Sequence, residues 1–429
     1  MVLNSLLRKR SFLLLGIVLL AGCGNNSAPA PMAAAPQAAA PTPTPAPKSA
    51  TPNSFDEVTS QLEPGGDFYL YLNTQQFLSK LDGFINSLHD MAASQSGGDP
   101  DVDKGFGVIK DIVHKSGVED VTGFGASSFC YTPGSHRNKI FVHHDPDKGS
   151  GLLWTLFGKA PHPLTQLDFL PSDTAYVAFT DFDLAQLINF ARQEALQSGV
   201  PEAQQAVNQW QTQFEGLTQL KLDDVLNSLN GSIGSLVTLD ATSTINVPSG
   251  NQTITIPTPR LAIFIGVKDD TIFKQIDKMA GANPGVIKVD QPDLRMRTMA
   301  LPMVPGLNLR PTVAQWNGYL IVATDDQLIN DLVAVQKGGA GFKTAADYLS
   351  LSANLPAEGN AFGYTSPTFV ETVHKFQSQM STNQANLSAS QAQAIQSWIS
   401  KYQPMFSGYS VGSQLPNGYL TISQGKFAK

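Results

Sequence analysis

The chain has 429 residues, of which 42% are hydrophobic and only 15% are charged. This length allows two or three average domains, and the hydrophobic share is sufficient for a substantial core. The formal net charge is −7, and it becomes −10 without residues 1–22, which carry three basic residues and no acidic residue. A chain this acidic disfavours binding to nucleic acid and to anionic lipid headgroups.

The first 23 residues have the pattern of an export signal. Residues 8–10 are basic, residues 12–20 are apolar apart from a glycine, and small residues come next. A basic segment, a short apolar segment and a small-residue cleavage point are typical of a signal peptide, here residues 1–22. The segment Leu20-Ala21-Gly22-Cys23 resembles the lipobox of bacterial lipoproteins. That resemblance implies lipid attachment at Cys23 and, because Gly24 follows instead of Asp, sorting to the outer membrane.

Residues 23–53 are expected to form a disordered tether that begins at the lipidated cysteine. The segment is rich in Ala, Pro, Ser and Thr and contains eight prolines, so it has neither helix-forming potential nor the apolar residues of a core. In a polyproline II conformation, at about 3.1 Å per residue, it would extend roughly 90 Å. An inert spacer is the favoured interpretation.

The rest of the chain repeats a short unit of one strand followed by one helix. Leu62-Glu63-Pro64, Leu170-Pro171 and Leu355-Pro356 each precede such a unit, and two further units over 261–276 and 319–332 lack the leading Leu-Pro. Irregular spacing of this kind indicates duplication with insertions, so we divide the chain into units over 54–169, 170–354 and 355–429, the last one partial and packed with the others. We expect the buried helix faces to contain Phe77, Leu81, Leu88, Leu184, Leu187, Ile188, Phe369, Val373 and Phe376.

Hairpin signals separate these units. Asn317-Gly318 and Asn417-Gly418 stand between apolar runs, and Ser249-Gly250-Asn251 separates two segments rich in β-branched residues. Several hairpins between helices argue against a regular parallel sheet. The sequence therefore predicts an α+β fold in which antiparallel sheets carry helices on one face and are built from duplicated strand-helix units.

Two motifs in the body of the chain resemble an exported bacterial family of unknown function. They are the pattern Leu-Pro-x-Asp-Thr-x-Tyr-Val at residues 170–177 and the stretch Leu222-Asp223-Asp224-Val225-Leu226, followed by Asn230-Gly231-Ser232-Ile233. The resemblance covers residues 62–424. It implies an address in the cell envelope and no activity, because no catalytic residue of the family is known to carry over.

One serine has the spacing of a hydrolase nucleophile. Gly408-Tyr409-Ser410-Val411-Gly412 matches the Gly-x-Ser-x-Gly elbow, in which an acid and then a histidine follow the serine along the chain. Residues 413–429 contain neither acids nor histidines. We therefore assign Ser410 no catalytic role and expect no catalytic residues in this chain, which we do not class as an enzyme.

The metal-ligand candidates are His143, His144, Asp145 and the nearby His136. On one strand, His143 and His144 would point to opposite faces, Asp145 would begin a hairpin turn, and His136 would lie on the preceding turn. We therefore expect no metal and no cofactor, and alanine at either position 143 or 144 should leave stability almost unchanged. Cys130, the only cysteine besides Cys23, is expected to be buried and inert.

These observations predict a lipid-anchored protein of the bacterial cell envelope, facing the periplasm from the outer membrane, with a non-catalytic binding or scaffolding role. The membrane is its partner through the lipid on Cys23, and an envelope protein or an apolar ligand is a further candidate. One alternative is a carrier that holds an apolar ligand between sheet and helices. Another alternative is a hydrolase whose site is assembled from distant residues.

Overall fold

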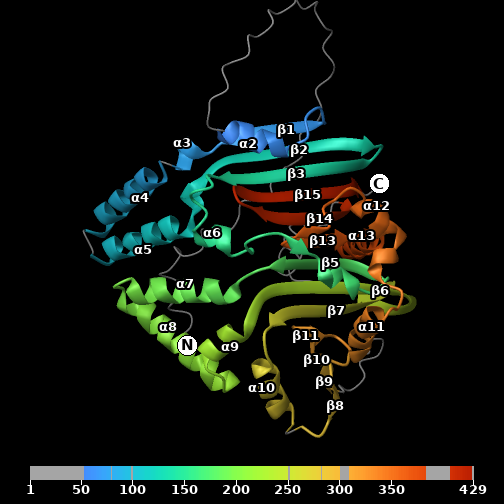
Figure 1. The fold of residues 1–429 in the computed structure, drawn as a ribbon. Helices are drawn as coiled ribbons and strands as arrows, with labels where there is room; N and C mark the ends of the chain where they lie inside the picture. The colour runs from blue at the N-terminus through green and yellow to red at the C-terminus, as the bar shows by residue number, and fades with distance from the viewer. Residues whose placement is uncertain are drawn as a thin grey trace, which may run out of the picture. The chain divides into compact units, whose positions relative to one another are not determined.

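One large antiparallel sheet organises the fold. The computed structural model describes residues 53–78, 80–97, 100–249, 252–281, 283–299, 309–382 and 406–427. The sheet has 13 strands in the order β1-β2-β3-β15-β14-β13-β5-β6-β7-β11-β10-β9-β8 (Figure 1). The strands are β1 (Phe68–Asn73), β2 (Val121–Thr132), β3 (Ser135–His144), β5 (Thr174–Asp181), β6 (Leu229–Ser249), β7 (Gln252–Val267), β8 (Val286–Gln291), β9 (Leu294–Met299), β10 (Thr312–Trp316), β11 (Tyr319–Ala323), β13 (Ala361–Thr365), β14 (Phe406–Leu415) and β15 (Gly418–Phe427). The prediction of an α+β fold with antiparallel pairing is confirmed.

Two short strands and the helices complete the described structure. β4 (His162–Pro163) and β12 (Glu358–Gly359) pair with each other in a separate small sheet. The α-helices are α2 (Ser54–Gln61), α3 (Gln75–Leu78), α4 (Leu81–Ser96), α5 (Pro100–Ser116), α6 (Leu152–Thr155), α7 (Leu184–Gln197), α8 (Pro201–Thr218), α9 (Leu222–Ser228), α10 (Thr271–Ala280), α11 (Asp326–Gln336), α12 (Ala346–Ser352) and α13 (Pro367–Thr382). Three short 3-10 helices are η1 (Val118–Asp120), η2 (Thr165–Asp168) and η3 (Phe342–Thr344).

Aspartate side chains cap the first turns of two helices. The Asp183 carboxylate accepts a hydrogen bond from the backbone N–H of Gln186 at 2.8 Å and caps α7. Asp325 caps α11 in the same way through the N–H of Leu328. These contacts satisfy backbone donors that the first turn of a helix leaves without intrahelical partners.

The two Asn-Gly hairpins differ in their turns. Asn317 and Gly318 both have positive φ, at 51° and 77°, which matches the twist of the flanking strands β10 and β11. In the β14–β15 hairpin, Leu415 pairs with Gly418, so that Pro416 and Asn417 form the turn. The second hairpin is confirmed, but its turn lies one residue before the expected position because Gly418 belongs to the strand.

Strands from all three expected units join in the one sheet. β14 and β15, from the C-terminal part of the chain, lie between β3 and β13. β15 pairs with β3 through nine residue pairs that run from Gly418↔His143 to Lys426↔Ser135. The C-terminal strand β15 is therefore joined to the β2–β3 hairpin by long-range pairing.

Helices contact both faces of the sheet, so the expectation of helices on one face is wrong. Leu320 and Ile321 are neighbours on β11 and point to opposite faces. Ile321 packs in the main core with Leu328 and Leu332 of α11, whereas Leu320 packs with Phe273 of α10. All five residues of β11 are hydrophobic, without a polar residue at alternate positions, because helices cover both faces of the sheet here.

The helix faces are less buried than the periodicity predicts. Leu184, Leu187 and Ile188 of α7 are half-buried, and so are Leu81 and Leu88 of α4 and Phe369 and Val373 of α13, whereas Phe77 and Phe376 lie outside the side chains that the structure describes. α4, α5, α7 and α8 contact one another in series and lie together at one end of the strands (Figure 1). These helices share their apolar faces with other helices, and for this reason α4 and α7 do not bury them against their own preceding strands.

Candidate functional site

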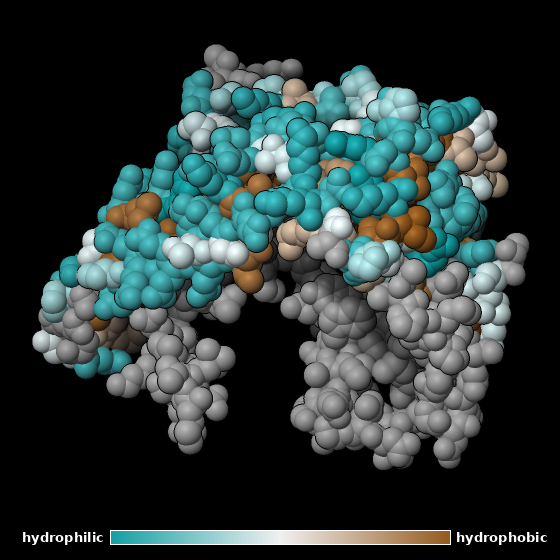
Figure 2. Space-filling view, turned by 90° about the horizontal axis from the view of Figure 1, so that it is seen from below, coloured by the Kyte–Doolittle hydropathy of each residue, from teal (hydrophilic) through white to brown (hydrophobic). Residues whose placement is uncertain are grey.

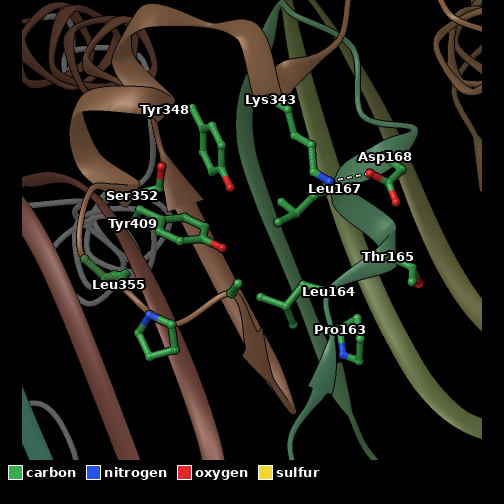
Figure 3. A pocket seen from close by; sticks show the side chains of 12 residues that line it. Pro163, Leu164, Thr165, Leu167, Asp168, Lys343, Tyr348, Ser352, Leu355 and Tyr409 are labelled. Atoms are coloured by element: carbon green, nitrogen blue, oxygen red, sulfur yellow. Dashed lines mark hydrogen bonds and ion pairs between the residues drawn. The ribbon is translucent and has the colours of Figure 1, made fainter.

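A partly open cavity of about 270 Å³ lies between the segment that leads into β5 and the segment around α12 (Figure 3). Contacts between η2 and η3 and the small β4–β12 sheet position its walls. Its lining combines apolar and polar side chains, namely Pro163, Leu164, Thr165, Leu167, Asp168, Lys343, Tyr348, Ser352, Leu355, Pro356, Ala357 and Tyr409. A concave apolar surface with a few polar groups is the usual form of a small-molecule site.

Two tyrosines form one wall of this cavity. Tyr409 comes from β14 and Tyr348 from α12, and their rings lie nearly perpendicular with centroids 5.2 Å apart. Their hydroxyls point toward the opposite wall, which contains Leu164 and Leu167 (Figure 3). Burial, together with the neighbouring Tyr348, raises the pKa of the Tyr409 hydroxyl well above its usual range. The phenol therefore stays protonated, and its hydroxyl interacts with that of Tyr348 at the cavity wall.

An ion pair lies on the same cavity. The Lys343 ammonium contacts the Asp168 carboxylate, and both side chains remain about half exposed (Figure 3). A pair this exposed adds little to stability. It places one positive and one negative group where a polar end of a ligand would meet them.

The cavity is suited to binding. Its twelve lining residues include hydroxyl groups at Thr165, Ser352 and the two tyrosines, but neither a histidine nor a cysteine. Nucleophilic catalysis needs a base within hydrogen-bond reach of the nucleophile. The lining therefore offers hydrogen bonds and apolar contact to a ligand, together with the charged groups of Lys343 and Asp168.

A polar network next to the cavity fixes the β4 segment. Nε2 of His162 lies 3.0 Å from Oδ2 of Asp181, and the Asn360 amide donates to the same carboxylate oxygen at 2.9 Å and to Ala160 O at 2.8 Å. Burial by itself would lower the pKa of His162, but the contacts with Pro163 O and the Asp181 carboxylate outweigh it and raise the pKa. Gly158 has φ of +90°, and a Cβ there would lie 2.5 Å from both Asn360 Nδ2 and Asp181 Oδ2.

Ser410 does not lie on a nucleophile elbow. It lies within β14, paired with Gly363 on one side and Ser423 on the other, and its Oγ is 3.5 Å from Gly363 O. The two flanking glycines belong to the same strand, where Tyr409 and Val411 point into the core. The geometry of a strand-to-helix turn is therefore missing at this serine.

A different hydroxyl–imidazole–carboxylate series occurs at a place where no sequence motif predicts one. Oγ1 of Thr122 lies 2.6 Å from Nδ1 of His143, and Nε2 of His143 lies 2.7 Å from Oε2 of Glu57 on α2. Thr122 and His143 are only 3% and 2% exposed. A hydroxyl this buried has no access to a substrate, so the series joins α2 to β2 and β3. It was missed because the helix α2 was not predicted.

The four metal-ligand candidates are not brought together. His143 contacts Glu57 on one face of β3, and His144 stacks on Trp154 with centroids 4.3 Å apart on the other face, as the alternation predicts. His136 lies near the opposite end of β3, seven residues or about 23 Å from His143. It is part of that strand and not of a turn, which corrects the expectation.

The structure also corrects the expectations for Asp145 and Cys130. Asp145 begins a β-turn, closed by Lys148 N–H to Asp145 O at 2.9 Å, which leads toward α6 and does not close a hairpin. Cys130 is exposed and not buried.

The predicted lipidation site Cys23, like the rest of residues 1–52, lies outside the described residues. Among the helices that the structure describes, none combines the length and apolar character needed to cross a bilayer.

Comparison with known proteins adds no assignment. No family model matches the chain, and no curated protein or solved structure is significantly similar to it.

Proposed function

We propose that this protein is a lipid-anchored component of the bacterial cell envelope that binds a small amphipathic ligand without transforming it. The observation that carries the binding role is the cavity with the Tyr348–Tyr409 wall facing Leu164 and Leu167. Its volume of about 270 Å³ lies just below the range of roughly 300–1,000 Å³ of drug-sized sites. The ligand is therefore compact, with a ring or short branched body and at least one hydrogen-bonding group.

The sequence supports the anchored address. Leu20-Ala21-Gly22-Cys23 resembles a lipobox, and Gly24 favours outer-membrane sorting in that pattern. The proline-rich stretch over residues 24–53 would separate the folded part from the membrane, in the periplasm. The coloured residues on the face seen in Figure 2 are mainly hydrophilic with separate hydrophobic patches, which suits a folded part held away from the bilayer.

The chemistry of the lining supports binding of a small molecule over the two earlier alternatives. A carrier of long apolar chains needs a deeper and drier cavity, whereas half of these lining residues are polar. A hydrolase needs an activated nucleophile, and the buried Thr122 and the strand residue Ser410 do not present one to a cleft. Binding of a small molecule with both apolar and polar parts fits the lining better than either.

The ligand role is tested with a neutral fluorescent probe, N-phenyl-1-naphthylamine, added to the purified full-length protein. We expect one saturable site. Ala357→Trp should weaken probe binding by at least about tenfold, because an indole at this exposed lining position fills the cavity. Ala353→Trp is the matched control, since Ala353 is exposed on the same segment and does not line the cavity. Equal weakening in both variants, or no saturable binding, would overturn the ligand role and leave scaffolding.

We also propose that the body of the chain arose by internal duplication. Counted from Leu170 and Leu355, Ala178 and Gly363 occupy the same position in their units, and they are register partners in the antiparallel β5–β13 pair. The sheet order on either side is β13-β14-β15 and β5-β6-β7, so each unit contributes a strand followed by a hairpin. In an experimental structure, rotation about an axis through the Ala178–Gly363 pair should superpose β5, β6 and β7 on β13, β14 and β15. A register shifted by one residue would contradict the duplication.

A further inference from the structure

We propose that Asp67, Cys130 and His136 bind one Zn²⁺ ion at the end of the β2–β3 hairpin. The three donor atoms lie within 4.8 Å of one another. Cys130 and His136 come from the two strands of one hairpin, and Asp67 comes from the turn before β1, far from them in the sequence. This site is independent of the ligand cavity, and it replaces the expectation that the protein holds no metal.

The backbone brings the thiol and the imidazole together. Cys130 and His136 are direct register partners on β2 and β3. Directly opposed residues on antiparallel strands place their Cβ atoms about 4.5–5.5 Å apart on the same face of the sheet. A register irregularity follows at Cys130/Thr132, beside the hairpin turn. The pair is thus held by a strand ladder at a point where the hairpin end is open to solvent.

Asp67 reaches this pair from the neighbouring strand. It directly precedes β1, whose first residue Phe68 pairs with Ser128 of β2. Gly66 permits the close approach, because a Cβ at that position would lie 2.1 Å from Ser128 O. The turn that carries Asp67 therefore lies directly against β2, next to Cys130.

The distances suit a tetrahedral ion after a small adjustment. Oδ2 of Asp67 lies 3.5 Å from Nδ1 of His136. In a tetrahedron with Zn–N and Zn–O bonds of about 2.1 Å, two such ligands are about 3.4 Å apart. Ideal S···N and S···O edges are about 3.6 Å, and the three donor atoms already lie within 4.8 Å of one another, so the sulfur has at most about 1.2 Å to move. The Cys130 thiol presently contacts Thr132 O at 3.3 Å, a weak hydrogen bond that it can give up.

The donor set selects the metal. Thiolate, imidazole and carboxylate together are typical ligands of zinc, whereas Mg²⁺ and Ca²⁺ prefer oxygen alone. One thiolate and one carboxylate neutralise the two charges of the ion. Because three protein ligands leave the fourth position to water, the site is open to solvent as catalytic zinc sites are.

A second cluster with metal-type residues is explained without an ion. His114 places Nδ1 2.5 Å from Oε2 of Glu119 and Nε2 3.7 Å from Oδ1 of Asp82, so the imidazole already bridges two carboxylates. It offers no thiolate. This cluster therefore provides the matched control.

The test uses full-length protein without a histidine tag, reduced and stripped with a chelator, and titrated with Zn²⁺ against a chromophoric competitor. We expect one equivalent to bind. Cys130→Ser and His136→Gln should each weaken binding by at least about 100-fold, since changes outside the first ligand shell already cost 10–100-fold. His114→Gln should bind as the wild type does. Co²⁺ should give a thiolate charge-transfer absorption that Cys130→Ser abolishes.

Two outcomes would overturn the proposal. Zn²⁺ affinity that is unchanged in Cys130→Ser would assign binding to other groups, and sub-stoichiometric binding by the wild type would remove the site. The melting temperature of each variant, measured without metal, shows that it is folded, and Asp67→Asn provides a third ligand variant outside the strands. Probe binding in the cavity should not change in any of these variants, so failure of the zinc site and failure of the ligand role are distinguishable.

Discussion

Nε2 of His143 lies 2.7 Å from Oε2 of Glu57, and this contact joins the first described helix to the sheet. The Asn417 side chain, in the turn between β14 and β15, donates to the same carboxylate oxygen at 2.7 Å. One carboxylate therefore connects α2, the β2–β3 hairpin and the β14–β15 hairpin. Burial by itself would raise the pKa of Glu57, but the hydrogen bonds from Asn417 and His143 outweigh it and lower the pKa.

This contact predicts a loss of stability at acidic pH. Because the folded-state pKa of Glu57 lies below its ordinary value of 4.5, its contribution is complete above that value and is lost as the pH falls through the folded-state pKa. Urea unfolding measures the free energy of unfolding at each pH. Below about pH 4.5, this free energy should fall less steeply with decreasing pH in Glu57→Gln than in the wild type. An identical pH dependence in both proteins would show that Glu57 does not contribute.

The buried His143 should contribute to stability, contrary to the expectation from the sequence. His143 is 2% exposed and hydrogen-bonded through both ring nitrogens, so His143→Ala removes the contacts of the ring with Thr122 and Glu57 and leaves Glu57 with the Asn417 hydrogen bond. We expect a decrease of about 1–3 kcal/mol in the free energy of unfolding. Chemical denaturation measures it, and a change below about 0.5 kcal/mol would restore the original expectation.

The contribution of His162 to stability should have the opposite pH dependence, because its pKa is raised and not lowered. Its folded-state pKa is raised above 6.5, so its contribution is complete below that value and is lost as the pH rises through the raised pKa. The difference in unfolding free energy between wild type and His162→Gln should therefore shrink from pH 6 toward alkaline pH. A difference that stays constant over this range would exclude the charged contact with Asp181 as its source.

The main core should respond strongly to truncation. Leu328 and Leu332 of α11 are fully buried against β11, and alanine at either position should cost about 2–5 kcal/mol of unfolding free energy. Ser410→Ala is the contrasting change within β14 and should remain within about 0.5 kcal/mol. Equal effects from the two kinds of substitution, measured by denaturant titration, would contradict this placement of the core.

The proposed lipid attachment depends on the sulfur atom of Cys23. Only Cys23 stands at the expected cleavage point, so Cys23→Ser should abolish incorporation of a fatty-acid analogue and the membrane fractionation of the mature protein. Cys130→Ser, which keeps Cys23, is the control and should label as the wild type does. Equal labelling of Cys23→Ser and wild type would refute the anchor.

The sequence by itself determined the local elements. Asp183 and Asp325 cap helices, and Asn317-Gly318 turns a hairpin, because each interaction joins residues at most four positions apart. The alternation that separates His143 from His144 is equally local, since successive side chains on a strand point to opposite faces. Such features follow from backbone geometry and need no knowledge of distant partners.

Only the tertiary structure decided the strand order, the covering of both faces and the sites. β15 inserts beside β3 across more than 270 residues of sequence, and Tyr409 meets Tyr348 and Leu164 from three separate segments. Asp67, Cys130 and His136 converge through pairing between β1, β2 and β3 in the same way. Many strand orders satisfy the same hydrophobic pattern, and the choice among them depends on long-range packing that no local signal encodes.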